Sequence, residues 1–133
     1  MDIDITLLEG QKRQENFGKH QIISDQSVSA GGDESHPEPF DYFAASMPLC
    51  AVFYIRKFCD SRSISTEGIK LAKENSNNGE DKYHRRFAIS VTLPEGFPDK
   101  YKKVLLAAAN TCKVKKVIKP CQNSIFILLT SAL

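Results

Sequence analysis

Residues 40–61 read FDYFAASMPLCAVFYIRKFCDS, and the spacing of their apolar side chains decides the fold. These side chains recur at three- and four-residue steps, which is the period of one face of an α-helix. Pro39 suits the first turn of such a helix, where its missing N–H is no loss. Pro48 removes a backbone hydrogen bond from the interior, so we predict a bend two residues before Cys50. The stretch therefore predicts a long central helix that carries Cys50.

Short strands are predicted on both sides of this helix. Residues 2–8 alternate apolar and polar side chains, which is typical of a half-buried strand, and the polar stretch 10–18 is predicted to be a turn. A second helix is predicted to begin near Asp99 and to carry Cys112 near its end, and residues 75–79 are predicted to form a turn. The predicted strands are residues 2–8, 19–24, 64–73, 83–93 and, as a buried final strand, 124–130.

The resulting order is ββ-α-ββ-α-β, which defines an α+β fold. A length of 133 residues fits one domain over residues 1–133. A single domain of this size leaves much apolar surface exposed, and a partner subunit would cover part of it.

The composition excludes several classes of function. The acidic, alternating N-terminus predicts no secretory or mitochondrial targeting segment, and no apolar run approaches the roughly 20 residues needed to cross a bilayer. We therefore expect a cytoplasmic protein. A net charge of +2 is too small to indicate nucleic acid or a membrane as the main partner. Four cysteines in a reducing compartment indicate free thiols, a metal site or catalysis rather than a disulfide framework.

Two of these cysteines, Cys50 and Cys112, lie on predicted helices beside basic residues. The thiolate is the attacking species in thiol chemistry, and positive charge or helix N–H groups favour it. With two such thiols, one can attack an electrophilic oxygen and the other can close a disulfide on the resulting sulfenic acid. The nearby basic residues are Lys113, Lys115 and Lys116 after Cys112, and Arg56 and Lys57 after Cys50.

Simpler explanations of the same residues stay open. A cysteine on the apolar face of a helix is most often a packing residue. Cys59 should face away from Cys50 on an ideal helix, and we interpret Cys59 and Cys121 as bystanders. A zinc site is disfavoured because the spacings Cys50-x8-Cys59 and Cys112-x8-Cys121 lack the short knuckle of structural zinc. The three histidines, at positions 20, 36 and 84, show no ligand spacing either.

The basic segment 113–119 raises the question of nucleic-acid binding. It has no interleaved aromatic residues and no GxxG clamp, which RNA-binding modules use. A solvated helix face explains its lysines better. Asp41 likewise has a simple role available, since an acid in the first turn of a helix stabilises the helix dipole.

Three blocks of sequence resemble the OsmC/Ohr family of thiol-dependent peroxidases. Their order and the 62-residue separation of Cys50 and Cys112 match the family as well. The blocks are HQIISD at 20–25 with Gly31-Gly32 after it, PEPFDYFAASMPLC at 37–50, and AAANTCKVKKVI at 107–118.

This resemblance implies an OsmC-like α+β fold in an intertwined homodimer, with no cofactor and no metal. It implies that Cys50 attacks the peroxide, that Cys112 resolves the product as an intramolecular disulfide, and that Asp41 is the orienting acid. The implied substrates are organic hydroperoxides, bound in an apolar pocket with residues such as Phe40, Phe43 and Met47. The implied reductant is a dithiol of the lipoyl type, and the implied context is a stress response without nucleic-acid or membrane partners.

Several residues depart from the family pattern. Asp41 lies one position later than the acid of the best-studied branches, and Lys113 and Lys115 replace the usual Pro and His after the second cysteine. The activating arginine of the family comes from an early strand, whereas Arg13 lies in a predicted turn. Pro48 replaces a small residue. These departures leave a weakly active or non-catalytic stress-response or binding protein on the same scaffold as the alternative.

Overall fold

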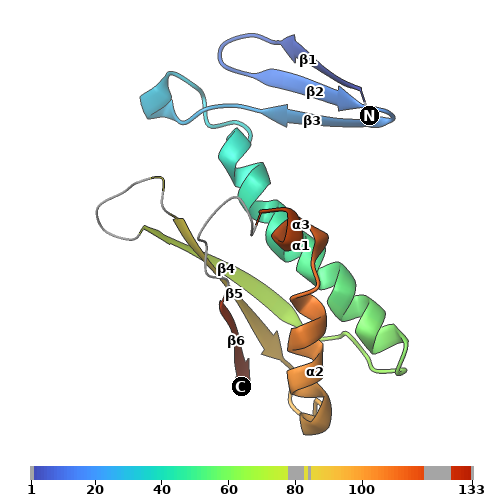
Figure 1. Ribbon diagram of the computed structural model, residues 1–133. Helices are drawn as coiled ribbons and strands as arrows, with labels where there is room; N and C mark the ends of the chain where they lie inside the picture. The colour runs from blue at the N-terminus through green and yellow to red at the C-terminus, as the bar shows by residue number, and fades with distance from the viewer. Residues whose placement is uncertain (1, 78–82, 84, 119–126, 133) are drawn as a thin grey trace. The chain divides into compact units, whose positions relative to one another are not determined.

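The structure is a computed structural model that describes residues 2–77, 83, 85–118 and 127–132. Its contacts divide the chain into two compact units, Met1–Ala45 and Ser46–Leu133. Figure 1 labels the helices and strands of both units. The expectation of a single domain over residues 1–133 stays a prediction.

The first unit contains a three-stranded antiparallel sheet in the order β1-β2-β3. Its strands are β1 (Ile3–Leu7), β2 (Arg13–Phe17) and β3 (His20–Ser24) (Figure 1). The predicted turn over residues 10–18 is therefore wrong, because that stretch contains the middle strand. β2 pairs with a neighbour on each side through its backbone, and that pairing does not require apolar side chains.

The apolar face of β1 is open to solvent within this chain. Ile3, Ile5 and Leu7 are 52%, 65% and 80% exposed, so the predicted half-buried strand is wrong for the isolated chain. β1 forms where the alternation predicts a strand, but the described residues leave its apolar side chains exposed.

A buried carboxylate organises the segment between β3 and the first long helix. Asp25 is fully buried, and its Oδ2 accepts hydrogen bonds from the N–H of Asp33 at 3.3 Å and from the N–H and Oγ of Ser35 at 3.1 and 2.8 Å. Burial alone would raise the pKa of Asp25, but these bonds and one from the Gln26 N–H lower it to about 2. A Cβ on Gly32 would lie 2.1 Å from the Gln26 carbonyl oxygen, so only glycine fits there.

The long helix α1 (Pro39–Asp60) begins in the first unit and continues in the second. Tyr42 fixes its first turn to β3, since the Tyr42 hydroxyl donates to the Ile23 carbonyl oxygen at 2.6 Å. The helix continues without interruption through Pro48. The predicted long helix is confirmed.

The second unit contains a mixed sheet in the order β4-β5-β6. β4 and β5 are antiparallel, whereas β5 and β6 are parallel and therefore need a crossover connection. That connection includes two helices (Figure 1). The elements are β4 (Lys70–Asn77), β5 (Arg85–Leu93), α2 (Asp99–Ala109), α3 (Lys113–Ile118) and β6 (Ile127–Ala132).

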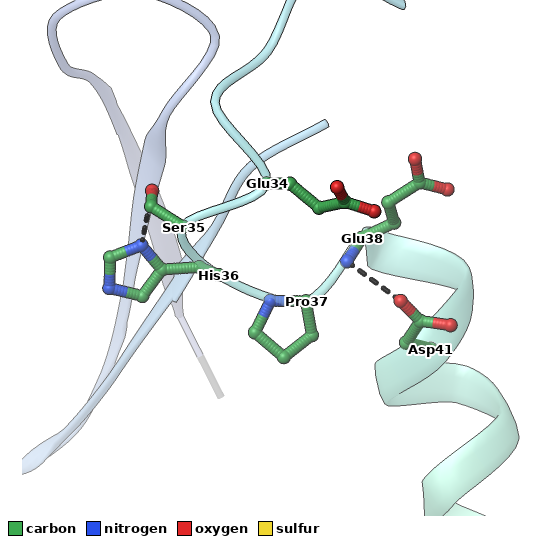
Figure 2. Close-up of a pocket in the computed structure, with 6 residues that line it drawn as sticks. All are labelled: Glu34, Ser35, His36, Pro37, Glu38 and Asp41. Atoms are coloured by element: carbon green, nitrogen blue, oxygen red, sulfur yellow. Dashed lines mark hydrogen bonds between the residues drawn. The ribbon is translucent and has the colours of Figure 1, made fainter. Parts of the chain in front are cut away.

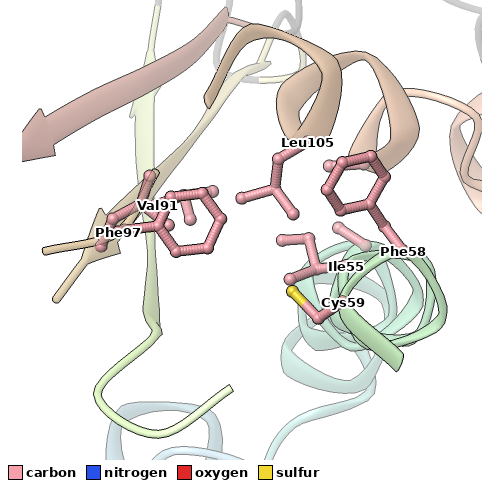
Figure 3. Close-up of a cluster of buried hydrophobic side chains, with 9 residues drawn as sticks. Ile55, Phe58, Cys59, Val91, Phe97 and Leu105 are labelled. Carbon is pink, nitrogen blue, oxygen red and sulfur yellow. The ribbon is translucent and has the colours of Figure 1, made fainter. Parts of the chain in front are cut away.

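The core of the second unit lies between α1, β5 and α2. β5 alternates as predicted, with every second side chain from Phe87 to Leu93 buried. Figure 3 shows Ile55 and Phe58 of α1 facing Leu105 of α2. The complete cluster is Ala51, Ile55, Phe58, Cys59, Val91, Leu93, Phe97, Leu105 and Ala109.

Several strand boundaries in this unit differ from prediction. β4 begins at Lys70 rather than at residue 64, because Gly68 has a φ of +77° that interrupts an extended backbone. It continues to Asn77, which pairs with Arg85, so the predicted turn is wrong for residues 75–77, and residues 78 and 79 lie outside the described part of the chain. The final strand is Ile127–Ala132 rather than 124–130, and residues 124–126 lie outside the described part of the chain.

The fold is α+β with a long central helix, as predicted. Among the described residues, it contains one strand more than the predicted order ββ-α-ββ-α-β, namely β2, and one short α-helix more, namely α3. Both additions come from polar or basic stretches whose side-chain pattern shows no clear period. Their formation depends on backbone pairing and on neighbouring elements.

Candidate functional site

The second unit brings Cys50 and Cys112 together. Cys50 lies in the middle of α1 and is partly exposed, whereas Cys112 is fully buried. A hydrogen bond joins the two sulfurs, and the Cys112 thiol also contacts the Met47 carbonyl oxygen at 3.9 Å. Both thiols are free.

Cys112 is not carried by the helix that was predicted to hold it. α2 ends at Ala109, and Cys112 is the residue immediately before α3. This position turns the N–H groups at the start of α3 toward the thiol pair: those of Lys113 and Val114 donate to Cys50, and those of Val114 and Lys115 donate to Cys112. The chain break between α2 and α3 therefore supplies donors that an uninterrupted helix would have used internally.

The surroundings of Cys50 favour its thiolate. Partial burial acts to raise the pKa of Cys50, but the Cys112 thiol, the N–H groups of Val114 and Lys113 and the Lys115 ammonium together lower it. Arg56, which follows Cys50 in the sequence, acts on Cys59. The charge that reaches Cys50 comes from α3.

Cys112 has the opposite tendency. Burial and the neighbouring Cys50 raise the pKa of Cys112, although two backbone N–H groups partly oppose them. Cys50 is therefore the more acidic of the two thiols, and the Cys112 S–H can donate to the Cys50 sulfur. The pair thus consists of one partly exposed, more acidic thiol and one buried, less acidic thiol.

Lys115 belongs to this site, although the sequence predicted a solvated lysine. It is only 5% exposed, whereas Lys113 and Lys116 are exposed as expected. Its Nζ donates to the Asn110 Oδ1 at 3.2 Å. A position three residues after Cys112 returns to nearly the same side of a helix, and that spacing was the available signal.

The other two cysteines have different positions. Cys59 is fully buried in the core cluster, where burial raises its pKa. This position fits the interpretation of Cys59 as a bystander (Figure 3). Cys121 lies outside the described residues, as do His84 and Lys119.

Asp41 lies in the first unit, in the first turn of α1. Its Oδ2 accepts the backbone N–H of Glu38 at 3.0 Å, and Glu38 in turn accepts the N–H of Ser27 at 2.8 Å. The first contact is the reciprocal half of a helix cap, in which a side chain of the first turn binds back to the N-cap residue. Asp41 thus has a structural task at the helix start, and its role as an orienting acid stays a prediction.

Figure 2 shows the open pocket beside this helix start. It has a volume of about 640 Å³ and three carboxylates in its wall, so its chemistry differs from the predicted apolar pocket. Its residues are Glu34, Ser35, His36, Pro37, Glu38 and Asp41. Of the residues expected in an apolar pocket, Met47 is fully buried, and the rings of Phe40 and Phe43 contact each other with centroids 5.8 Å apart.

A second pocket of the first unit contains Arg13. It has a volume of about 200 Å³ and mostly apolar walls, and its residues are Ile5, Arg13, Glu15, Ile22, Ser24, Pro39 and Tyr42. Arg13 is the first residue of β2, not part of a turn. The structure therefore corrects the sequence-based position of the one arginine available on an early strand.

Among the described residues, no group of three or more His, Cys, Asp or Glu side chains could hold a metal ion. Within the same residues, no helix is long and apolar enough to span a membrane.

The difference between the thiols predicts an order of alkylation. With iodoacetamide near neutral pH, Cys50 should react at least about tenfold faster than Cys112, since only the accessible thiolate reacts quickly. Buried Cys59 should react last. Peptide mass analysis after timed quenching measures the three rates, and the same measurement in urea is the control in which they converge. Modification of Cys112 or Cys59 ahead of Cys50 would contradict the assignment.

The comparison with protein families gives a match to the family described as OsmC-like protein, over residues 31–125. This range begins at the glycine pair before α1 and includes both Cys50 and Cys112. Among curated protein sequences, no match is found.

Solved structures share the fold at low sequence identity. A Psychrobacter arcticus protein, whose description refers to osmotic stress and detoxification, is 20% identical with a TM-score of 0.75, covering 97% of this chain and 94% of its own. An OsmC-like protein from Mycoplasma pneumoniae is 12% identical with a TM-score of 0.74, covering 99% and 96%. An organic hydroperoxide resistance protein from Elizabethkingia anophelis is 17% identical with a TM-score of 0.69, covering 100% and 97%.

Proposed function

Because the chain belongs to the OsmC-like protein family, we propose that it reduces organic hydroperoxides through a two-cysteine cycle. The observation that carries the proposal is the asymmetry of the thiol pair. Cys50 is accessible and its pKa is lowered, whereas hydrogen-bonded Cys112 is buried and its pKa is raised. A peroxidatic and a resolving cysteine need this division of roles.

The first step is attack of the Cys50 thiolate on an oxygen of the hydroperoxide. An S–O bond forms, the O–O bond breaks, and the alkoxide leaves as an alcohol after taking up a proton. Cys50 becomes a sulfenic acid, and the peroxide is reduced by two electrons. Backbone N–H groups of α3 that favour the thiolate prepare Cys50 for this attack.

The second step closes the disulfide. The Cys112 sulfur attacks the Cys50 sulfur, the S–S bond forms, and the sulfenic oxygen leaves as water with the Cys112 proton. The two thiols are hydrogen-bonded to each other before oxidation, which favours this step. A dithiol of the lipoyl type then restores both thiols by exchange and becomes a disulfide itself.

The family suggests two further parts of the proposal. Asp41 would be the orienting acid. A cytoplasmic location would keep both cysteines reduced between cycles.

We also propose that the functional form is a homodimer. Apolar side chains are exposed on both units, including Ile5 and Leu7 of β1 and Leu49 and Phe53 of α1, which are 69% and 60% exposed. Exposed apolar surface of this extent favours association with a second subunit. A second copy of the chain is the partner that the family suggests.

Disulfide mapping after oxidation tests the proposal. One equivalent of cumene hydroperoxide should lower the intact mass by about 2 Da through a single Cys50–Cys112 disulfide. Hydrogen peroxide at the same ratio serves as a comparison for the preference for organic peroxides. The Cys59→Ser variant is the matched control and should oxidise like the natural chain. An intact protein mass that peroxide leaves unchanged would instead support a non-catalytic binding protein on this scaffold.

A further inference from the structure

The two helices that follow β5 carry an excess of positive charge. Residues 99–118, which contain α2 and α3, include six lysines and one acidic residue, Asp99, whereas the whole chain has a net charge of only +2. Asp99 is paired with Lys102 at 2.6 Å. Part of the surplus charge is carried by α3, which follows Cys112 directly.

Two lysines of α3 share an exposed face. Lys113 and Lys116 are exposed and lie three residues apart, which places their side chains on the same side of the helix. Lys115, between them in the sequence, is buried. Among the described residues, no ion pair involves Lys113 or Lys116. Their ammonium groups are therefore available to a charged molecule from solution.

This exposed face lies beside the thiol pair. Lys113 follows Cys112 directly, and the Lys116 N–H donates to the Cys112 carbonyl oxygen at 3.1 Å. The Cys112 thiol contacts the carbonyl oxygen of Met47, one turn before Cys50 on α1, at 3.9 Å, and it is hydrogen-bonded to Cys50. Cys112 itself is fully buried, so a molecule from solution reaches the pair at the partly exposed Cys50.

Reduction of a Cys50–Cys112 disulfide is the step in which these charges have most effect. Because Cys112 is buried, the first thiolate of a dithiol attacks the Cys50 sulfur, the S–S bond breaks, and Cys112 leaves as a thiol after taking up a proton. The second thiolate then attacks the dithiol's own sulfur in the mixed disulfide with Cys50. Cys50 is released, the dithiol becomes a disulfide, and two electrons have passed to the protein. The attacking species is an anion in both exchanges.

We propose that Lys113 and Lys116 form the docking surface of the reductant, and that they select a dithiol that carries negative charge close to its sulfurs. The inference deepens the proposed function, since it rests on a Cys50–Cys112 disulfide that a dithiol reduces. Opposite charges at such a surface raise the rate of encounter. Oxidation also removes the ionisable thiol of Cys50, so the surroundings of the pair are more positive when the reductant arrives than when the neutral peroxide does.

The experiment compares two reductants that share one dithiol and differ in charge. Dihydrolipoate carries a carboxylate, and dihydrolipoamide carries a neutral amide in its place. The chain is first oxidised with diamide, and mass analysis of acid-quenched samples then follows the loss of the Cys50–Cys112 disulfide. In about 0.1 M salt, the natural chain should be reduced about two- to fourfold faster by dihydrolipoate. In about 1 M salt, this preference should disappear, because the charges are screened.

Variants assign the preference to the two lysines. Lys113→Gln combined with Lys116→Gln should abolish the preference for dihydrolipoate and leave the rate with dihydrolipoamide unchanged. Lys100→Gln is the matched control, because Lys100 is also exposed but lies at the start of α2, about 14 Å of helix from its end. That distance exceeds the screening length of about 10 Å in 0.1 M salt, so the control should keep the natural preference.

An equal preference in the double variant and the natural chain would overturn the inference. A preference that 1 M salt leaves unchanged would overturn it too, and that measurement needs no variant. Oxidation by diamide needs no peroxide, so a chain that prefers dihydrolipoate but ignores cumene hydroperoxide loses only the peroxidase proposal. A chain that reduces peroxide but shows no preference loses only the docking surface.

Alkylation of reduced Cys50 decides the role of the lysines if diamide forms no disulfide. Iodoacetate is an anion, whereas iodoacetamide is neutral and reacts by the same displacement. The ratio of the iodoacetate rate to the iodoacetamide rate should fall about two- to fourfold in the double variant and stay unchanged in Lys100→Gln. The same ratio in all three chains would contradict the proposed surface.

Discussion

Replacing Cys50 by serine is expected to lower cumene hydroperoxide turnover by at least about a thousandfold. A serine hydroxyl is not ionised near neutral pH, and the donors that favour the thiolate cannot make it a comparable nucleophile. The assay follows peroxide loss with dihydrolipoamide as the reductant. Because Cys50 is only partly buried, the substitution should leave the fold intact.

Two further variants make this result specific. Cys112→Ser should still consume one equivalent of peroxide but should stop at the sulfenic acid, which dimedone traps on Cys50. Cys59→Ser should keep full turnover, since Cys59 lies in the core cluster. Natural turnover in Cys50→Ser would exclude the proposed cycle.

Leu105→Ala is expected to reduce the free energy of unfolding by about 2–5 kcal/mol. Leu105 is fully buried and lies between α1 and the residues of β5 in the core cluster (Figure 3). Truncation removes apolar burial and leaves a cavity that the rigid neighbours fill only in part. Urea unfolding followed by circular dichroism measures the loss, at one protein concentration because association would also stabilise the chain.

Val104→Ala is the matched control for this substitution. Val104 precedes Leu105 on α2 and is 48% exposed, so its truncation should change the free energy of unfolding by no more than about 0.5 kcal/mol. Equal losses in the two variants would mean that α2 does not pack as described.

The sequence predicted those elements whose side chains follow a regular period. α1 and β5 were found because one face of each is apolar at helical or alternating spacing, and burial then follows the pattern. β2 was missed because its polar side chains carry no such signal, and its backbone pairing depends on the strands at either side. Propensity and pattern are local, whereas pairing partners are not.

The helix that carries Cys112 illustrates the same limit. The apolar stripe of α2 continues in sequence to Cys112, so one helix was predicted where the structure has α2, a break and α3. The break leaves the N–H groups at the start of α3 without intrahelical partners, and the two cysteine sulfurs accept hydrogen bonds from them. Where a helix ends depends on such competing acceptors, which come from another part of the chain.

By itself, the sequence determined the α+β class, the central helix and the candidate pair Cys50 and Cys112. The tertiary structure alone decided that the two sulfurs meet, that Cys50 is the more acidic thiol and that Lys115 is buried beside them. The physical reason is that pKa values and burial depend on atoms from α1, the α2–α3 turn and α3 at once. Cys50 and Cys112 lie 62 positions apart in the sequence, so no local sequence pattern indicates that they are in contact.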